Sequence, residues 1–356
     1  MYGVIMAGGR GSRFWPRSRK RRSKQVLNIV GRNTMIQDTV YRLSPLISPR
    51  QVIIVTNHLL ADEIRRQLPA VPPENVMVEP ANLSTMPCVG LAAVYIRKHH
   101  REAVMAVFAA DHVIQDVPTF HRALEFAEKL CVEHGALVTF GAKPTAPETG
   151  YGYLEMGEKI AGEEPLCARS VVRFNEKPDL ETAERYVADG RHRYNTGMFV
   201  WTVEAILEEY EKLEPDAYRK LTRIEDAIGT PSEFKALGEV FPTLPNVSID
   251  KAIMERSSRV IMVETDFGWN DMGSWTSLYN TWPKDDDGNA VVGQTLRLDT
   301  KNCLIYSPNR FVATLGIENV IIVETDDVVM VCGRDRAQDV SRFVEELRDR
   351  KLEEFL

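Results

Sequence analysis

Glycines and basic residues gather near the N-terminus of this chain, directly after a short apolar segment. Gly8, Gly9 and Gly11 lie within four positions, and Arg13 and Lys24 follow them. Glycines let a backbone adopt conformations closed to other residues and let its N–H groups approach an anion. The apolar segment predicts a buried parallel strand. The pattern therefore predicts a strand leading into a phosphate-binding turn, although a tight turn before a solvated basic loop explains the glycines equally well.

Two familiar phosphate-binding motifs do not fit this turn. A dinucleotide fingerprint needs a third glycine where Phe14 stands, and no Gly-Lys-Ser/Thr follows at the spacing of a P-loop. A nicotinamide dehydrogenase is therefore disfavoured.

Two aspartates have positions that suit a metal ligand. Asp111 follows the apolar run Ala-Val-Phe-Ala-Ala, and Asp271 lies between Gly268 and Gly273. Mg²⁺ prefers one or two carboxylates together with phosphate oxygens, so both aspartates are candidates. Asp111 is equally suited to capping a turn or the helix predicted to start near Pro118.

A different set of polar residues follows the later strands. Glu176 and Lys177 stand together at the end of one predicted strand, and Asn195 begins another. A carboxylate accepts hydrogen bonds from sugar hydroxyls and an ammonium binds phosphate, so the pair suits a sugar phosphate. An ordinary surface ion pair is the alternative. Gly152, beside Tyr151, would let a backbone amide approach a ligand, although a plain β-hairpin also explains this glycine-rich stretch.

These residues are carried by alternating helical and strand patterns. Such alternation predicts parallel strands with right-handed crossovers, and open sheets of this kind bind ligands beyond the carboxyl ends of their strands. The predicted helices are 34–47, 58–68 and 86–101, and the predicted strands are 51–56, 75–78, 103–108, 171–174, 194–201 and 260–264.

The chain changes character after the polar stretch 284–289. We expect a catalytic domain over 1–284 and a second domain over 285–356, in which short β-rich runs are spaced like solenoid coils. Residues 336–356 predict an amphipathic helix that docks on its own domain. The predicted fold is α/β: a Rossmann-like mixed, mostly parallel sheet flanked by helices, then a small β-rich, left-handed β-helix-like domain with a terminal helix.

Composition excludes several classes of function. A net charge of -7 over 356 residues argues against nucleic-acid and membrane partners. The basic run 17–24 is a local exception, which suits a nucleic-acid or localisation patch or an electrostatic funnel for a small polyphosphate. Five cysteines without a Cys-x-x-Cys pair predict reduced thiols. Neither a leader nor an apolar stretch of about 18 residues is found, so we expect a cytoplasmic protein.

Taken in order, the motifs resemble those of the mannose-1-phosphate guanylyltransferases, within the wider sugar-1-phosphate nucleotidyltransferases. The resemblance spans nearly the whole chain, and the ordered set is far more specific than any one motif. The motifs are Gly8 to Pro16 with Lys24-Gln25, Glu79-Pro80 with Thr85 and Pro87, Asp111-His112, Pro144 to Tyr153, Glu176-Lys177-Pro178, Asn195 to Phe199, Ser248-Ile249-Asp250 and Trp269 to Trp275.

The resemblance implies a role for each motif. Mg²⁺ would be bound by Asp111 and Asp271, and guanine would lie near Glu79 and Thr85. Guanine offers N–H donors on its N1 and N2 edge, which suits an acceptor-only carboxylate, whereas thymine or uracil would suit an amide better. The GTP triphosphate would be held by Gly8, Gly9, Gly11, Ser12, Arg13 and Lys24, and mannose 1-phosphate by Gly152, Glu176, Asn195 and, at its phosphate, Lys177.

The implied reaction is in-line attack by mannose 1-phosphate on the α-phosphorus of GTP, which gives GDP-mannose and pyrophosphate. No general base is needed, because a phosphate monoester with a second pKa of about 6 is already largely ionised. The catalytic residues would be Arg13, Lys24, Asp111, Lys177 and Asp271.

Other interpretations remain open. One is transfer from UTP or dTTP to glucose 1-phosphate, and another is a non-catalytic nucleotide-sugar sensor. A homodimer is a candidate assembly. The chain carries no isomerase domain of the kind found in two-function relatives, so isomerase activity is not expected. The sequence departs from the family at Ser23, where proline is usual, and at Leu83-Ser84, where Arg-Asn is usual.

Overall fold

The computed structural model describes residues 1–9 and 11–356, so Arg10 of the glycine turn lies outside the described residues. The described residues form two compact units, and each is discontinuous in sequence. The first unit holds 1–8, 40–110 and 114–269, and the second holds 9–39, 111–113 and 270–356. The boundary expected after residue 284 stays a prediction, because these interleaved units do not divide the chain at one point.

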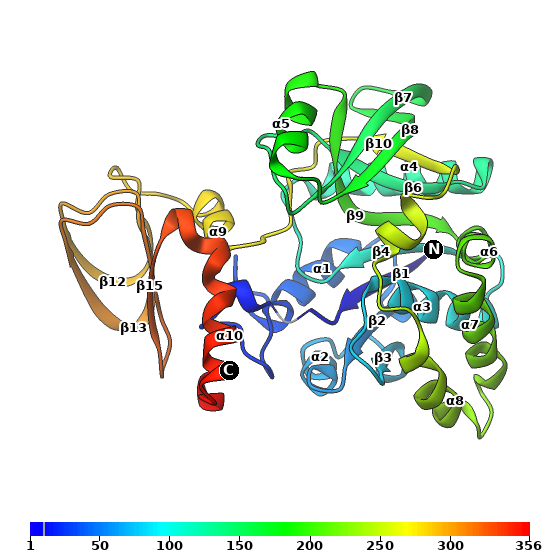
Figure 1. Cartoon of the computed structure of the whole chain (residues 1–356), viewed down its shortest axis with the longest axis horizontal. Coiled ribbons are helices and arrows are strands. Elements are labelled where there is room, and N and C mark those ends of the chain that lie inside the picture. Colours follow the sequence, from blue (N-terminus) through cyan, green and yellow to red (C-terminus); the bar gives the residue numbers. More distant parts are fainter. Residues whose placement is uncertain (10) are drawn as a thin grey trace. The chain divides into compact units, whose positions relative to one another are not determined.

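A nine-stranded sheet organises the first unit (Figure 1). Its order is β3-β2-β1-β4-β9-β6-β10-β8-β7. Strand β1 pairs in parallel with β2 and β4, whereas β9 runs antiparallel to β4 and β6. The expected mixed sheet is confirmed. The strands are β1 Tyr2–Ala7, β2 Val52–Asn57, β3 Val76–Glu79, β4 Val104–Ala109, β6 Leu137–Ala142, β7 Gly152–Glu163, β8 Leu166–Glu176, β9 His192–Thr202 and β10 Val260–Glu264.

Helices pack on this sheet and bury its apolar strands. Helix α3 (Thr85–His99) is apolar around most of its circumference and lies deep in the core, as expected for a helix covered on several sides. Helix α4 (Val117–His134) is capped by Asp116, whose side chain accepts from the Thr119 N–H, so Asp111 is not its cap. The other helices with residues in this unit are α2 Ala61–Gln67, α5 Leu180–Asp189, α6 Val203–Leu213, α7 Pro215–Ala227, α8 Glu233–Val240 and α1 Met35–Leu43, whose residues are divided between the two units.

The second unit contains a four-stranded sheet, β12-β13-β14-β15. Strands β12 (Ala290–Leu298), β13 (Leu304–Leu315) and β14 (Val320–Glu324) pair in parallel, and β15 (Val329–Gly333) is antiparallel. Parallel pairing of successive strands is the arrangement expected of solenoid coils. The expected small β-rich domain with a terminal helix is confirmed, although the sequence predicts separate short runs at 302–306 and 311–314 and the structure joins them in the single strand β13. Two short strands, β5 Val113–Ile114 and β11 Trp269–Asn270, lie where the chain passes between units.

The core of the second unit joins its N-terminal and C-terminal segments. Phe14, Trp15 and Leu27 pack with Trp275 and Leu278 of helix α9 (Trp275–Thr281). The N-terminal segment that carries the glycine turn therefore folds onto the C-terminal part of the chain.

The terminal helix is shorter than the prediction of 336–356. Helix α10 covers Ser341–Asp349, between a 3-10 segment at Arg334–Val340 and another at Glu353–Phe355. Lys351 has a φ of 59°, a left-handed conformation that ends a helix. Val340, Val344 and Leu347 do pack on the core of their own unit. No helix among the described residues has the length and apolar character needed to span a membrane.

Candidate active site

Two glycines of the N-terminal turn pack against the segment that carries Lys24. Gly11 has a φ of 59°, and a Cβ atom there would lie 2.7 Å from Ser18 Oγ and 2.9 Å from Lys24 Cβ. A Cβ atom on Gly9 would lie 2.8 Å from Gln25 Nε2. Gly11 therefore requires glycine, because its φ is left-handed and a side chain would press on Lys24, whereas a side chain at Gly9 would displace the end of the Gln25 side chain.

Lys24 lies between the two predicted metal ligands. Its side chain is 5% exposed. Its Nζ lies 2.9 Å from Asp111 Oδ2 and donates to the Asp271 carbonyl oxygen at 2.8 Å. Burial alone would raise the pKa of Asp111, but the Lys24 ammonium and His112 outweigh it, so that pKa lies below its ordinary value. Asp111 is therefore ionised at neutral pH.

The chemistry of this cluster suits a divalent cation. The Lys24 ammonium already occupies a place bordered by oxygen atoms of Asp111 and Asp271. The Asp271 carboxylate accepts the Gly273 N–H at 3.0 Å, which orients it. Among the described residues no group of three or more His, Cys, Asp or Glu is arranged so that it could hold a metal ion. An aspartate pair fits Mg²⁺, which commonly takes one or two carboxylates and completes its shell with water and phosphate.

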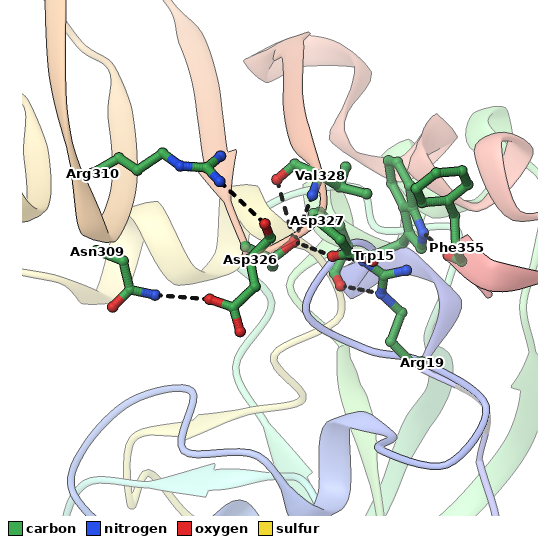
Figure 2. Close-up of polar contacts among 10 residues, drawn as sticks. Trp15, Arg19, Asn309, Arg310, Asp326, Asp327, Val328 and Phe355 are labelled. Carbon is green, nitrogen blue, oxygen red and sulfur yellow. Dashed lines mark hydrogen bonds and ion pairs between the residues drawn. The ribbon is translucent and has the colours of Figure 1, made fainter.

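The loop between the glycine turn and Lys24 is held by the C-terminal segment (Figure 2). The Trp15 indole donates to the Phe355 carbonyl oxygen at 2.8 Å, and the Trp275 indole donates to the Trp15 carbonyl oxygen at 3.1 Å. Arg19 Nη2 lies 2.8 Å from Asp327 Oδ1. Sequence reasoning missed these positioning contacts, because Arg19 and Asp327 are separated by 308 positions.

The turn that receives Arg19 is itself anchored. Figure 2 shows Asn309 and Arg310 directed at Asp326, whose side-chain and main-chain oxygens they contact at 3.2 and 3.1 Å. Other members of the basic run also have partners in this unit, since Arg17 stacks on the Tyr306 ring and Lys20 pairs with Glu353. Much of the basic run therefore has a structural role, whereas Arg13 is exposed and Ser12 half-buried.

Ser23 keeps the backbone geometry that a proline would impose. Its φ is -70°, close to the angle that a proline ring fixes. Its hydroxyl donates to the Gln25 side chain. The departure from the family pattern is therefore compatible with the same loop conformation.

Four predicted sugar-site residues come together in the first unit. Gly152 opposes Glu176 in the β7–β8 ladder, and a Cβ atom on Gly152 would lie 2.6 Å from Glu176 Oε2 and 3.3 Å from Asn195 Cβ. Lys177 has a φ of 55° and donates its N–H to the Tyr151 carbonyl oxygen. Its Nζ lies 3.0 Å from Glu176 Oε1. Glycine at 152 therefore leaves the room that the Glu176 carboxylate occupies.

Asn195 is buried and its amide is held by several partners. Its Oδ1 accepts from Thr139 Oγ1 at 2.9 Å and from the Gly197 N–H at 3.2 Å. Its Nδ2 donates to Asp250 Oδ1 at 3.0 Å. Burial and the nearby Glu176 carboxylate raise the pKa of Asp250 to about 7. Asp250 belongs to the Ser248-Ile249-Asp250 motif, to which sequence reasoning assigned no role, and the available signal was an acid directly after an apolar residue.

The residues predicted near the base also lie in the first unit. Glu79 ends β3, is 5% exposed, and its Oε1 has no hydrogen-bond partner among the described residues. Burial raises its pKa to about 8. A Cβ atom on Gly8 would lie 3.6 Å from Glu79 Oε2, so Gly8 is beside this carboxyl group. Thr85 begins α3 and its hydroxyl accepts the Ile249 N–H at 2.9 Å.

Comparison with known proteins places the chain in a family. A family model described as nucleotidyl transferase matches residues 2–288, and one described as MannoseP isomerase/GMP-like beta-helix domain matches 293–347. The chain belongs to the nucleotidyl transferase family. Its resemblance to the mannose-1-phosphate guanylyltransferases is also confirmed. A protein of that name from Klebsiella pneumoniae is 40% identical over 99% of this chain and 75% of its own length. Xanthan biosynthesis protein XanB of Xanthomonas campestris pv. campestris (strain B100) is 38% identical over 97% of this chain and 73% of its own length.

Solved structures agree with this placement. A crystal structure from Thermus thermophilus, described as a mannose-1-phosphate geranyltransferase, superposes with a TM-score of 0.87 at 31% identity. The match covers 98% of this chain and 99% of that one. A Helicobacter pylori mannose-6-phosphate isomerase shares the fold, with a TM-score of 0.60 and 24% identity. That match covers 76% of this chain and 99% of the isomerase chain. The nucleotidyl transferase part and the β-rich part of this chain therefore both have the fold found in these relatives.

Proposed function

We propose that this chain transfers GMP from GTP to mannose 1-phosphate, giving GDP-mannose and pyrophosphate. The observation that carries the proposal is similarity over 97–99% of the chain to relatives such as the Klebsiella pneumoniae mannose-1-phosphate guanylyltransferase and XanB. Two residue clusters support it. One joins Lys24 to Asp111 and Asp271, and the other joins Glu176 to Lys177 and Asn195.

The reaction needs charge and positioning more than acid-base chemistry. A phosphate oxygen of mannose 1-phosphate forms a bond to the α-phosphorus of GTP, and the bond from that phosphorus to the bridging oxygen breaks, releasing pyrophosphate. The attacking phosphate is already anionic near pH 7, since its second pKa is about 6. Arg13 and Lys24 would hold the triphosphate and Lys177 the attacking phosphate, so that their charges offset repulsion between two anions.

Asp111 and Asp271 would hold Mg²⁺. When bound there, the ion would neutralise phosphate charge and orient the triphosphate. Lys24, which contacts both aspartates, would then be placed to bind the same phosphates. Gly8, Gly9, Gly11 and Ser12 would offer backbone N–H groups to the triphosphate.

Recognition of the two organic groups would come from the first unit. Glu79 would accept from guanine N1 and N2, and Thr85 would lie near the base. Gly152, Glu176 and Asn195 would contact mannose. The buried Oε1 of Glu79, which has no partner among residues 1–9 and 11–356, supports this role, because a buried polar atom without a partner is costly unless a ligand satisfies it.

A substrate panel tests the proposal. Initial rates of pyrophosphate release would be measured with GTP, ATP, UTP and dTTP, each with mannose 1-phosphate or glucose 1-phosphate, in Mg²⁺ buffer. We expect GTP with mannose 1-phosphate to be at least tenfold faster than every other pair. Rates with UTP or dTTP that exceed those with GTP by tenfold would overturn both the substrate assignment and the role of Glu79.

An Asp111→Asn protein separates an enzyme from a nucleotide-sugar sensor. This change keeps the size of the side chain but removes its charge. We expect pyrophosphate release to fall by at least a hundredfold, while GDP-mannose still binds. Unchanged release would mean that the activity comes from another site or from contamination. A homodimer and a cytoplasmic location stay predictions.

A further inference from the structure

A single π turn lies behind the proposed sugar site. It covers Asp250–Met254 and is closed by a hydrogen bond of 2.8 Å from the Glu255 N–H to the Asp250 carbonyl oxygen. Such i to i+5 turns are rare and occur often at functional sites, because they change which side chains face a neighbouring element. Here the turn brings Asp250 and Glu255 to the same side of the helix.

Each of these acids contacts one predicted sugar ligand. Asp250 Oδ1 accepts from Asn195 Nδ2 at 3.0 Å, and Glu255 Oε1 accepts the main-chain N–H of Glu176 at 2.7 Å. The first contact orients the side-chain amide of Asn195, and the second holds the backbone of Glu176. The π turn therefore holds two residues on two different strands, β8 and β9.

The contacts leave Asn195 a defined role. Its carbonyl oxygen accepts the Gly197 N–H and faces the Thr139 hydroxyl, whose one proton is shared with the Met198 carbonyl oxygen at 3.1 Å. One N–H of its Nδ2 is used by Asp250. The amide is thereby locked against rotation, and the remaining N–H is the one polar group that it offers to a ligand. Asn195 is thus a hydrogen-bond donor, and the neighbouring Glu176 carboxylate is an acceptor.

The turn is itself fixed to the body of the first unit. The Thr85 hydroxyl accepts the Ile249 N–H at 2.9 Å, and the Ser248 carbonyl oxygen accepts the Ala252 N–H at 2.9 Å. Ile249 and Ile253 are fully buried. Asp250 and Glu255 therefore act from a rigid support, which is the condition for holding ligands in one geometry.

We propose that Asp250 and Glu255 are positioning residues for the sugar of the sugar 1-phosphate substrate, acting through Asn195 and Glu176. This inference rests on the proposed function. It predicts that the sugar accepts one hydrogen bond from Asn195 and donates at least one to Glu176. Loss of the Asp250 contact should weaken sugar binding more than loss of the Glu255 contact, because Asp250 is half-buried and Glu255 is exposed.

Pairs of variants test whether Asp250 and Glu255 act through Asn195 and Glu176. Alanine removes the acceptor at either position, whereas Asp250→Asn and Glu255→Gln keep an oxygen that can accept the same hydrogen bond. Lys251→Ala is the control, because Lys251 is an exposed residue of the same turn. KM and kcat would be measured separately for GTP and for mannose 1-phosphate, with melting temperatures to confirm folding.

We expect Asp250→Ala to raise the KM for mannose 1-phosphate about tenfold to a hundredfold, and Glu255→Ala about threefold to tenfold, in the range of a lost buried or exposed hydrogen bond. The KM for GTP should stay within twofold. The amide variants should stay within fivefold of the unmodified protein, and Lys251→Ala within twofold.

Equal losses in Asp250→Ala and Asp250→Asn would overturn the proposal, since Asp250 would then contact the substrate through its charge. Normal kinetics in Asp250→Ala would overturn it as well, and so would equal increases of both KM values in a protein that melts normally. If the unmodified protein prefers another sugar 1-phosphate, the proposed function fails. The same comparison with that substrate still decides the inference.

Discussion

Glu79 provides the sharpest test of how guanine is recognised. Its carboxyl group is buried, its Oε1 lacks a partner among the described residues, and burial raises its pKa to about 8. If only the ionised carboxylate binds guanine, about one molecule in eleven is ready at pH 7 and about three in four at pH 8.5. We therefore predict that the affinity for GDP-mannose rises about eightfold between these two pH values.

Isothermal titration calorimetry with GDP-mannose measures this directly. Its diphosphate bridge, unlike the γ-phosphate of GTP, does not titrate in this range. In buffers of different ionisation enthalpy, binding at pH 7 should release about 0.9 proton from Glu79. The Glu79→Gln protein keeps every other titrating group, including Asp250, so the difference between the two pH profiles belongs to Glu79. Identical profiles would refute contact between guanine and the Glu79 carboxylate.

The same pKa has an opposite consequence for the stability of the free protein. The folded pKa of about 8 lies above the ordinary value of 4.5, so the folded chain binds this proton more tightly than the unfolded chain. The stabilisation that this bound proton gives to the folded chain is complete below pH 4.5 and is lost as pH rises towards 8. The loss amounts to roughly 5 kcal/mol at 1.36 kcal/mol per pKa unit. Across this pH range, the free energy of unfolding measured with denaturant should decline less in Glu79→Gln than in the unmodified protein, and equal declines would contradict a raised pKa at Glu79.

Three further predictions concern the rest of the site. Gly11→Ala should raise the KM for GTP about tenfold, because a left-handed φ costs roughly 1–2 kcal/mol in a residue with a Cβ atom and that atom would press on Lys24. An unchanged KM would count against the turn as a phosphate site. Gly152→Ala should displace the Glu176 carboxylate and raise the KM for mannose 1-phosphate at least tenfold, with the KM for GTP as the internal control. Removing Mg²⁺ with EDTA should abolish pyrophosphate release, and added Mg²⁺ should restore it; full activity in EDTA would exclude a metal role for Asp111 and Asp271.

The sequence by itself determined the fold class and the identity of the chemical groups. Alternating apolar patterns predicted the α/β sheet because strand and helix periodicities are local properties of the chain. The parallel pairing of β1 with β4 then followed the general rules for such sheets. Lys24, Asp111 and Glu176 were recognisable because motifs retain order along the sequence even when the structure brings them together from distant positions.

Only the tertiary structure decided how these groups are held. The contact of Lys24 with Asp111, the support of Arg19 by Asp327, and the π turn under Asn195 all join residues far apart in sequence. The pKa of Glu79 likewise depends on burial by neighbours that its own sequence position does not reveal. Local patterns specify elements, whereas hydrogen-bond partners and desolvation arise from packing between elements, and therefore appear only once the chain is folded.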